Sequence, residues 1–316
     1  MNFYLHTLTS ILVLVILILL VVFLRHRALL KEENGLLFSW LVMQVTLPAL
    51  IFSALSHSEM QWQYFLLFLI MMSVEIILLA LSWGMGRMMK LRREQMGSFM
   101  LASSFGSSAL LGYALIVEVF PDNSAVLAEA AFVSELGVGL PFFIIGVMVA
   151  IHYGSHEQKK ITLLEGALPF FRSPIFFSIV SGILWSVLSL PTKGAVATPF
   201  FDMIDLIAQA NTFLVALTVG VLLKFGSLRD ILAVVLATIL LKLILSPLLV
   251  SLPAGLMDLE IWQRQVLILE AAMPSAMLSV VLANRYGCDA ALAAKLVFVT
   301  LFVSILSTSI MLKILI

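Results

Sequence analysis

Charged residues interrupt long apolar stretches of this sequence, among them Glu75, Glu135, Lys242 and Glu270. If these stretches cross a bilayer, each charge costs about 2.5–3.5 kcal/mol at the bilayer centre, so each needs a partner or a task. A carboxylate in such surroundings can bind a coupling cation or carry a proton. We predict this coupling or gating role for Glu270, with Glu75 and Glu135 as further candidates. The alternative for Glu270 is a hydrogen-bonded residue near the membrane surface.

Glu270 stands four residues before Pro274. Proline has no N–H and clashes with the preceding turn, so it kinks or breaks a helix, and it suits the first turn of a new one. A simple kink is one interpretation. A broken helix, with Pro274, Ser275 and Ala276 at the break, is the other.

A second interruption is predicted within Ser98–Gly112, where nine of fifteen residues are Gly, Ala or Ser. Small residues allow close helix packing, which is one interpretation. The other is a helix that breaks near Gly106–Ala109, which is tolerated at membrane depth only inside protein or beside water. In that case Ser107, Ser108 and Gly112 would frame half of a substrate site.

The two interruptions fall at corresponding places when the sequence is shifted by about 167 residues, which superposes Ser107 on Pro274. Paired interruptions of this kind are the best sequence indication of a binding site in a transporter. Two half-helix N-termini that meet would present N–H groups and positive dipole ends. The pattern therefore predicts an anion site, most simply for a carboxylate.

Two amides, Gln44 and Asn211, also lie within apolar stretches. Such groups often bridge neighbouring helices. They could instead line the substrate cavity, and the sequence leaves both interpretations open.

The elements that position these residues follow from composition. Of the 316 residues, 62% are hydrophobic and only 11% are charged, against about 25% charged in a soluble domain. Such a chain predicts an all-α integral membrane protein, since a span needs about 20 apolar residues. We predict ten transmembrane helices: Leu5–Leu24, Leu36–Leu55, Tyr64–Gly86, Gly97–Val117, Val126–Ile151, Pro174–Leu190, Pro199–Leu223, Ile231–Val250, Trp262–Ala283 and Ala290–Leu312.

Loop charges predict the orientation, because Lys and Arg concentrate on the cytoplasmic side. With the N-terminus outside, the inner loops contain Arg25, Arg27, Lys31, Arg87, Lys90, Arg92, Arg93, Lys159, Lys160, Arg172, Lys224, Arg229 and Arg285. The outer side contains Lys193, Arg264 and Lys313. We therefore expect a multi-pass protein of the cytoplasmic membrane, in contact with lipid, with both termini outside.

The shift of 167 residues also predicts a 5+5 inverted repeat. Residues 1–155 would be the first half, 156–172 a cytoplasmic connection and 173–316 the second half. Five spans per half is an odd number, so the second half would enter the membrane upside down. The shift superposes Glu75 on Lys242, for which both an ion pair and a proton or ion site remain open.

Other functions find little support in the residues. The sequence has no His-Glu-x-x-His, phosphate-loop or Gly-x-Ser-x-Gly motif. We expect no enzyme activity, no metal site and no cofactor, apart from H⁺ or Na⁺ as a coupling ion. A formal net charge of zero gives no reason to expect nucleic-acid binding.

Several short motifs together resemble the auxin efflux carrier family of permeases. They are Leu47–Phe52, Phe105–Tyr113, Arg172–Pro174, Ala272–Pro274 and Tyr286–Asp289, in this order along nearly the whole chain. The family often has Asn where Ser107 stands and Pro where Ala114 stands. The first interruption is therefore expected to be weaker than the second.

The resemblance implies a fold shared with bile acid:sodium symporters. The fourth and ninth helices would be discontinuous and cross at the midplane, with substrate beside the crossing. Helices 3–5 and 8–10 would form a core that moves like an elevator. Helices 1, 2, 6 and 7 would form a scaffold and the interface of a homodimer.

These observations predict a secondary active transporter of a small organic anion. One alternative is a membrane receptor or sensor on a transporter fold, which would bind ligand without turnover. Another is an intramembrane enzyme, which would need a catalytic cluster facing the cavity.

Overall fold

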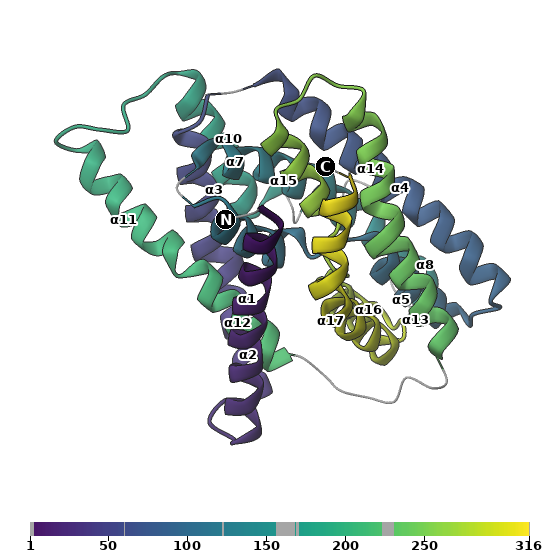
Figure 1. The fold of residues 1–316 in the computed structure, drawn as a ribbon. Coiled ribbons are helices and arrows are strands. Elements are labelled where there is room, and N and C mark those ends of the chain that lie inside the picture. Colours follow the sequence, from purple (N-terminus) through teal and green to yellow (C-terminus); the bar gives the residue numbers. More distant parts are fainter. Residues whose placement is uncertain are drawn as a thin grey trace. The chain divides into compact units, whose positions relative to one another are not determined.

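The computed structural model describes residues 3–59, 61–121, 123–155, 168, 171–222 and 231–315, and these residues are helical apart from loops and one isolated β-bridge (Figure 1). The helices are α1 (Phe3–His26), α2 (Glu32–Leu41), α3 (Leu47–Ser56), α4 (Trp62–Met88), α5 (Arg93–Ser104), α6 (Tyr113–Val119), α7 (Ser124–Ala131), α8 (Val147–Tyr153), α10 (Pro174–Val187), α11 (Ala197–Gln209), α12 (Asn211–Leu222), α13 (Leu232–Thr238), α14 (Ser246–Gly255), α15 (Ile261–Ala271), α16 (Leu278–Tyr286) and α17 (Ala290–Leu315). Most of the predicted connection 156–172, with Lys159 and Lys160, lies outside the described residues, as do Lys224 and Arg229.

Within the described residues, five continuous helical runs are long and apolar enough to cross a membrane. They are Trp62–Met88, Ser124–Tyr153, Ala197–Val221, Leu232–Gly255 and Ala290–Leu315. Each coincides with a predicted span. Helices also cover the other five predicted spans: α1 is continuous over Phe3–His26, α2, η1 and α3 follow one another without a break, and the remaining three are shorter or interrupted. The all-helical membrane architecture is confirmed, and the count of ten crossings stays a prediction.

In the part of the chain that the structure describes, five π-helical segments widen the helices locally: η1 (Val42–Thr46), η2 (Ser108–Gly112), η3 (Phe132–Gly139), η4 (Phe142–Gly146) and η6 (Ile239–Leu245). Three of them end two residues before a proline, namely Pro48, Pro141 and Pro247. Proline removes the i→i−4 hydrogen bond and crowds the carbonyl one turn earlier, which favours a wider turn there. Segments η3 and η6 carry Glu135 and Lys242, so the widened turns coincide with intramembrane charges.

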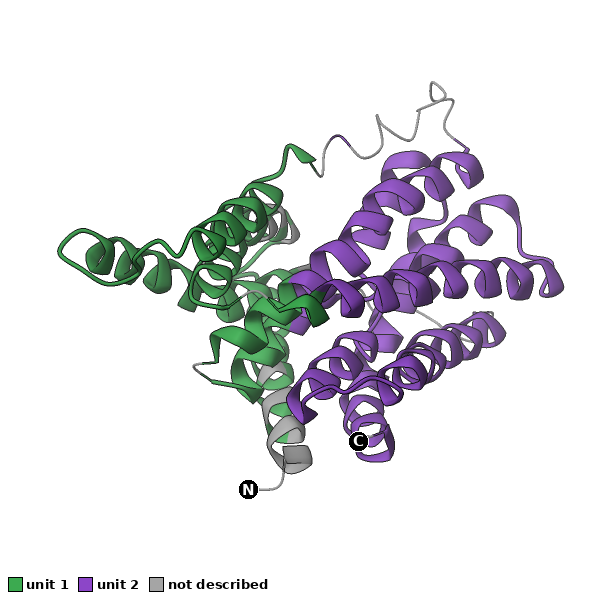
Figure 2. Ribbon diagram, turned by 90° about the horizontal axis from the view of Figure 1, so that it is seen from above, with its two compact units in different colours: residues 1–64, 113–131, 170–223 green, residues 65–112, 132–169, 224–316 purple. Residues whose placement is uncertain are grey.

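The described chain divides into two compact units, coloured separately in Figure 2. Unit 1 comprises Met1–Tyr64, Tyr113–Ala131 and Phe170–Leu223, and unit 2 comprises Phe65–Gly112, Phe132–Pro169 and Lys224–Ile316. This division follows the scaffold and core that the resemblance implies, with one difference. The segment Tyr113–Ala131 belongs to unit 1, because α6 packs on α1 and α12 while α7 packs on α3.

Unit 1 is built on α3, which packs against α10 and α11, and on α12, which packs against α1 and α2. The Phe52 ring stacks on Phe201 with centroids 5.9 Å apart, and Trp185 meets Phe201 edge-on at 5.5 Å. The Ser53 hydroxyl donates to Asp205 Oδ1 at 2.5 Å beside this cluster. Aromatic packing and a few polar links therefore hold α3, α10 and α11 together.

Unit 2 surrounds α5, which packs against α8, α13, α16 and α17. Hydrogen bonds tie the start of α5 to the turn before α17. Ser98 Oγ donates to the Asp289 carbonyl at 2.7 Å, and the Asp289 N–H donates to the Glu94 carbonyl at 3.1 Å. The Ser155 N–H, just after α8, donates to the Gly287 carbonyl at 3.0 Å. These links join segments far apart in sequence into one frame.

Candidate functional site

Two interrupted helices of unit 2 meet through their main chains. Helix α5 ends at Ser104, and α15 ends at Ala271. The Ser107 N–H donates to the Pro274 carbonyl at 2.7 Å, and the Ala276 N–H donates to the Phe105 carbonyl at 2.9 Å. These two bonds flank an antiparallel bridge between Gly106 and Ser275. Both interruptions predicted from sequence are therefore present, and they lie against each other; we call this contact the crossing.

The first interruption is the shorter one, as the resemblance implied. Only 105–107 are non-helical before η2 begins, whereas 272–277 separate α15 from α16. Pro274 accounts for the difference, because it lacks an N–H and forces the preceding residue towards an extended conformation. Side chains of α17 complete the second loop: the Ser275 N–H donates to Thr300 Oγ1 at 3.1 Å, and Thr308 Oγ1 donates to the Ala272 carbonyl at 3.3 Å.

Two hydroxyls at the crossing have no hydrogen-bond partner. Ser107 Oγ and Ser275 Oγ are both buried and unpaired, although buried polar groups are normally satisfied. Each could donate to a bound ligand. Ser108 and Gly112 lie in η2 directly after Ser107, and Ala276 is engaged through its N–H. All six residues predicted to frame the substrate site thus lie at or next to the crossing.

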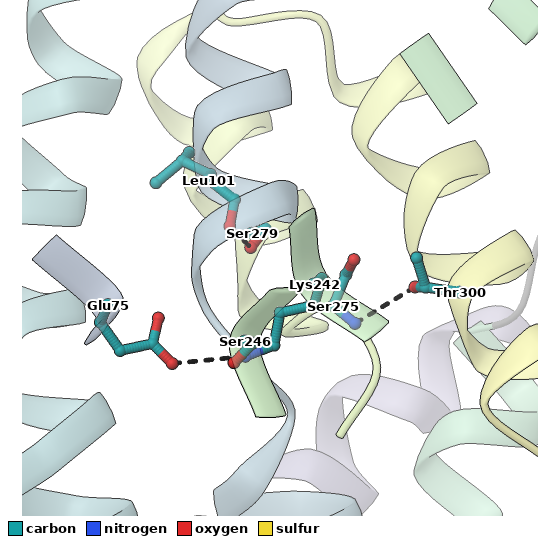
Figure 3. Close-up of polar contacts among 7 residues, drawn as sticks. All are labelled: Glu75, Leu101, Lys242, Ser246, Ser275, Ser279 and Thr300. Carbon is teal, nitrogen blue, oxygen red and sulfur yellow. Dashed lines mark hydrogen bonds and ion pairs between the residues drawn. The ribbon is translucent and has the colours of Figure 1, made fainter. Parts of the chain in front are cut away.

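A buried ion pair lies beside the crossing (Figure 3). Lys242 Nζ is 3.3 Å from Glu75 Oε1 and 3.4 Å from Ser246 Oγ, and both charged side chains are fully buried. Lys242 also packs on Gly106, where an added Cβ would lie 3.0 Å from both Cε and Nζ of the lysine. Of the two interpretations of Glu75 and Lys242, the ion pair is therefore the one that the structure contains.

Glu270 occupies the last turn of α15, immediately before the break. Its side chain is fully buried, and neither carboxylate oxygen has a hydrogen-bond partner. It packs on the backbone of Gly112, because a Cβ added there would lie 2.5 Å from Glu270 Oε2. Helix α15 also packs against η3, which contains the buried Glu135. The structure therefore brings all four predicted intramembrane charges into one region of unit 2, since Lys242 holds Glu75.

The two predicted amides lie in unit 1. Asn211 is buried and accepts a hydrogen bond from Thr46 Oγ1 at 2.9 Å, so it bridges two helices as one interpretation proposed. Gln44 is exposed within η1. Their role in lining a cavity stays a prediction.

Sequence reasoning missed Thr300 and Thr308, which support the second loop from α17. They are eight residues apart and therefore on one face of a helix, which is a periodic signal available in the sequence. It also missed the contact of Lys242 with Gly106. No local pattern encodes that contact, because the two residues come from segments far apart in the sequence. Among the described residues, no cluster of three or more metal-ligating side chains occurs.

These features define a multi-pass helical membrane protein with charged groups buried in its interior. The model of the family described as "Membrane transport protein" matches residues 6–312. The chain therefore belongs to this family, that of the auxin efflux carriers, and is a membrane transporter, not an enzyme.

Three relatives illustrate the similarity. "Uncharacterized transporter MJ1031" of Methanocaldococcus jannaschii is 27% identical over 309 residues, 94% of each chain. "Putative malonate transporter" of Rhizobium meliloti (strain 1021) is 25% identical over 290 residues, 88% of this chain and 87% of the relative. "Uncharacterized transporter YfdV" of Escherichia coli (strain K12) is 22% identical over 278 residues, 86% of each chain.

Proposed function

We propose that this protein is a secondary carrier that moves a small organic carboxylate across the cytoplasmic membrane. The observation that carries the proposal is the crossing, where two helix interruptions hydrogen-bond to each other and leave the hydroxyls of Ser107 and Ser275 unpaired. Irregular backbone at membrane depth is tolerated where it serves a buried or water-filled site. Interrupted helices are the usual binding elements of secondary transporters.

The chemistry of the crossing favours an anion. The runs Ser108–Val119 and Leu278–Tyr286 both begin there. The first turn of a helix has N–H groups without intrahelical acceptors and the positive end of the helix dipole. Two such ends, with two serine hydroxyls between them, suit the oxygens of a carboxylate.

Malonate is the first substrate to test. The Rhizobium meliloti relative, which aligns along most of this chain, is named for malonate. A dicarboxylate would also offer one carboxylate to each helix end. Malonate is therefore both the substrate for which one of these relatives is named and a molecule with the negative charge that the crossing favours.

We further propose that the two halves are inverted repeats and that unit 2, which carries the crossing, moves like an elevator. Contacts between equivalent positions support the repeat: Glu75 meets Lys242, and Ser107 meets Pro274, each pair 167 residues apart. A two-fold axis between halves brings equivalent residues together in this way. We also propose that both termini lie outside and that the protein forms a homodimer through the first, second, sixth and seventh predicted spans. Cysteine labelling in intact cells would test the orientation, and cross-linking would test the dimer.

The decisive experiment is exchange in proteoliposomes. Purified protein would be reconstituted into vesicles loaded with unlabelled malonate, and entry of external labelled malonate would be followed. We expect uptake well above that of protein-free vesicles, with competition from related mono- and dicarboxylates. Exchange of no carboxylate, by protein shown to be folded, would refute the proposal.

Two sets of variants connect the activity to the crossing. Pro274→Leu should abolish exchange, because leucine has a backbone N–H and allows the helix to continue through the position where proline interrupts it. Pro253→Leu, the same change within α14, is the matched control and should retain exchange. Ser107→Ala and Ser275→Ala should each weaken malonate binding by about 1 kcal/mol, or roughly fivefold, since each removes one hydrogen-bond donor.

A further inference from the structure

Unit 2 has an imbalance of buried charge around the crossing. Among its described residues, three carboxyl groups are buried, those of Glu75, Glu135 and Glu270, against a single buried ammonium group, that of Lys242. If all four were ionised, the carboxylates would outnumber the ammonium group by two in an apolar interior. Buried charges are stable only when they are paired and hydrogen-bonded.

Lys242 forms its ion pair with Glu75 and not with Glu270. Its ammonium is in contact with Glu75 Oε1 at 3.3 Å and is within 3.4 Å of Ser246 Oγ. Glu270 has no hydrogen-bond donor for either oxygen. The structure therefore contains a carboxyl group with no stable partner for its negative charge, next to the proposed substrate site.

The elements packed against α15 offer Glu270 no other cation. They are α14, α17, η2 and η3. Segments α14 and η2 contain no titratable side chain, and η3 contributes Glu135, a second carboxyl group. Helix α17 contains Lys295 and Lys313, but neither donates a hydrogen bond to Glu270. Two carboxyl groups that share an apolar site do not readily ionise together.

We propose that Glu270 binds a proton in each transport cycle, and that this makes the protein a proton-coupled carboxylate symporter. The inference rests on the proposed function and names its coupling ion. A proton from one side converts the Glu270 carboxylate into the neutral acid, and the same proton leaves on the other side. Because Glu270 packs on Gly112, five residues after Ser107, its negative charge repels an anion at the crossing. Neutralisation removes that repulsion, so proton and anion bind together.

The test uses the purified protein in proteoliposomes, with labelled malonate as the probe. In vesicles without preloaded malonate, an inwardly directed proton gradient of one pH unit, with the outside more acidic, should drive malonate accumulation of up to about tenfold per coupled proton. An inward Na⁺ gradient at equal pH should drive none. Glu270→Gln, which mimics the neutral acid, should lose the gradient-driven accumulation but keep malonate exchange. Glu270→Asp should keep both, and Glu118→Gln, the same change at an exposed position of α6, should behave as the unmodified protein.

Each outcome has a distinct meaning. If the unmodified protein exchanges no carboxylate, the proposed function itself is wrong. If it exchanges malonate but a pH gradient drives no accumulation, or a Na⁺ gradient does so instead, the proton inference is overturned and the carrier function stands. If Glu270→Gln is folded and still accumulates malonate with the pH gradient, Glu270 is not the proton site. If Glu270→Gln does not fold, the inference depends on Glu270→Asp, whose accumulation must follow the pH gradient.

Discussion

The Glu75–Lys242 pair offers the sharpest test of how unit 2 is held together. At 3.3 Å and an effective dielectric constant of about 20, the attraction between the two charges is about 5 kcal/mol. Removing one partner of a buried pair leaves the other charge uncompensated and typically costs about 3–5 kcal/mol. Lys242→Met and Glu75→Gln should therefore each lower the unfolding free energy by about that amount.

The double variant distinguishes a true pair from two independent residues. Glu75→Gln combined with Lys242→Met removes both charges together, and replacing a whole buried pair by neutral groups is often close to neutral. We expect the double variant to be no less stable than either single variant, which corresponds to a coupling energy of about 3 kcal/mol or more.

Thermal unfolding of the detergent-purified protein would measure these effects. At about 2 °C per kcal/mol, each single variant should melt roughly 6–10 °C below the unmodified protein. Lys313→Met, the same change at the exposed end of α17, is the control and should melt within about 1 °C of the unmodified protein, since surface changes are usually small. Additive losses in the double variant would refute the argument, because they would mean that the two charges do not stabilise each other.

Three further predictions concern other contacts. Gly112→Ala should reduce malonate exchange at least about tenfold, because its Cβ would lie 2.5 Å from the carboxylate of Glu270 and one of the two must move. Thr46→Val should lower the unfolding free energy by about 1–3 kcal/mol, measured by thermal melting, because it leaves buried Asn211 without its donor. Burial raises the pKa of the Cys288 thiol from 9.0 to about 11, so the folded state holds the proton more tightly than the unfolded state. The stability that this provides is complete below pH 9 and is lost as the pH rises through 11, so the melting temperature should fall across that window by more in the unmodified protein than in Cys288→Ala.

The controls for these predictions use neighbouring features of the chain. Gly84→Ala, where an added Cβ meets nothing within 4 Å, should leave exchange unchanged. Thr9→Val, the same change in α1, is the control for Thr46→Val. Equal losses in Gly112→Ala and Gly84→Ala, or identical melting of Thr46→Val and the unmodified protein, would contradict the respective contact. A Cys288→Ala protein whose melting temperature falls as steeply between pH 9 and 11 would contradict the thiol assignment.

The sequence predicted the interruptions well because their causes are local. Pro274 breaks α15–α16 by its own covalent structure, and the run of small residues around Gly106 marks the other break. The contact between Glu75 and Lys242 was one of two interpretations, and it followed from the shift that relates the two stretches.

Other features depend on neighbours that hydropathy does not specify. A hydropathy pattern gives the position of a residue along its helix, not which helix it faces. The pattern therefore did not reveal that Lys242 packs on Gly106, or that Tyr113–Ala131 belongs with unit 1. The wider turn at η6 was missed as well, because Pro247 indicates a local disturbance but not whether the helix kinks or widens.

The separation of Glu75 and Lys242 along the chain has a consequence for biosynthesis. The two residues are 167 positions apart, so the ribosome completes the carboxylate long before the ammonium that holds it. At about 5–20 residues per second, the interval is of the order of ten to thirty seconds. Throughout it, the carboxyl group of Glu75 in α4 has no partner from η6. Unit 2 is complete only once α17, which packs against α5, α15 and α16, has been synthesised.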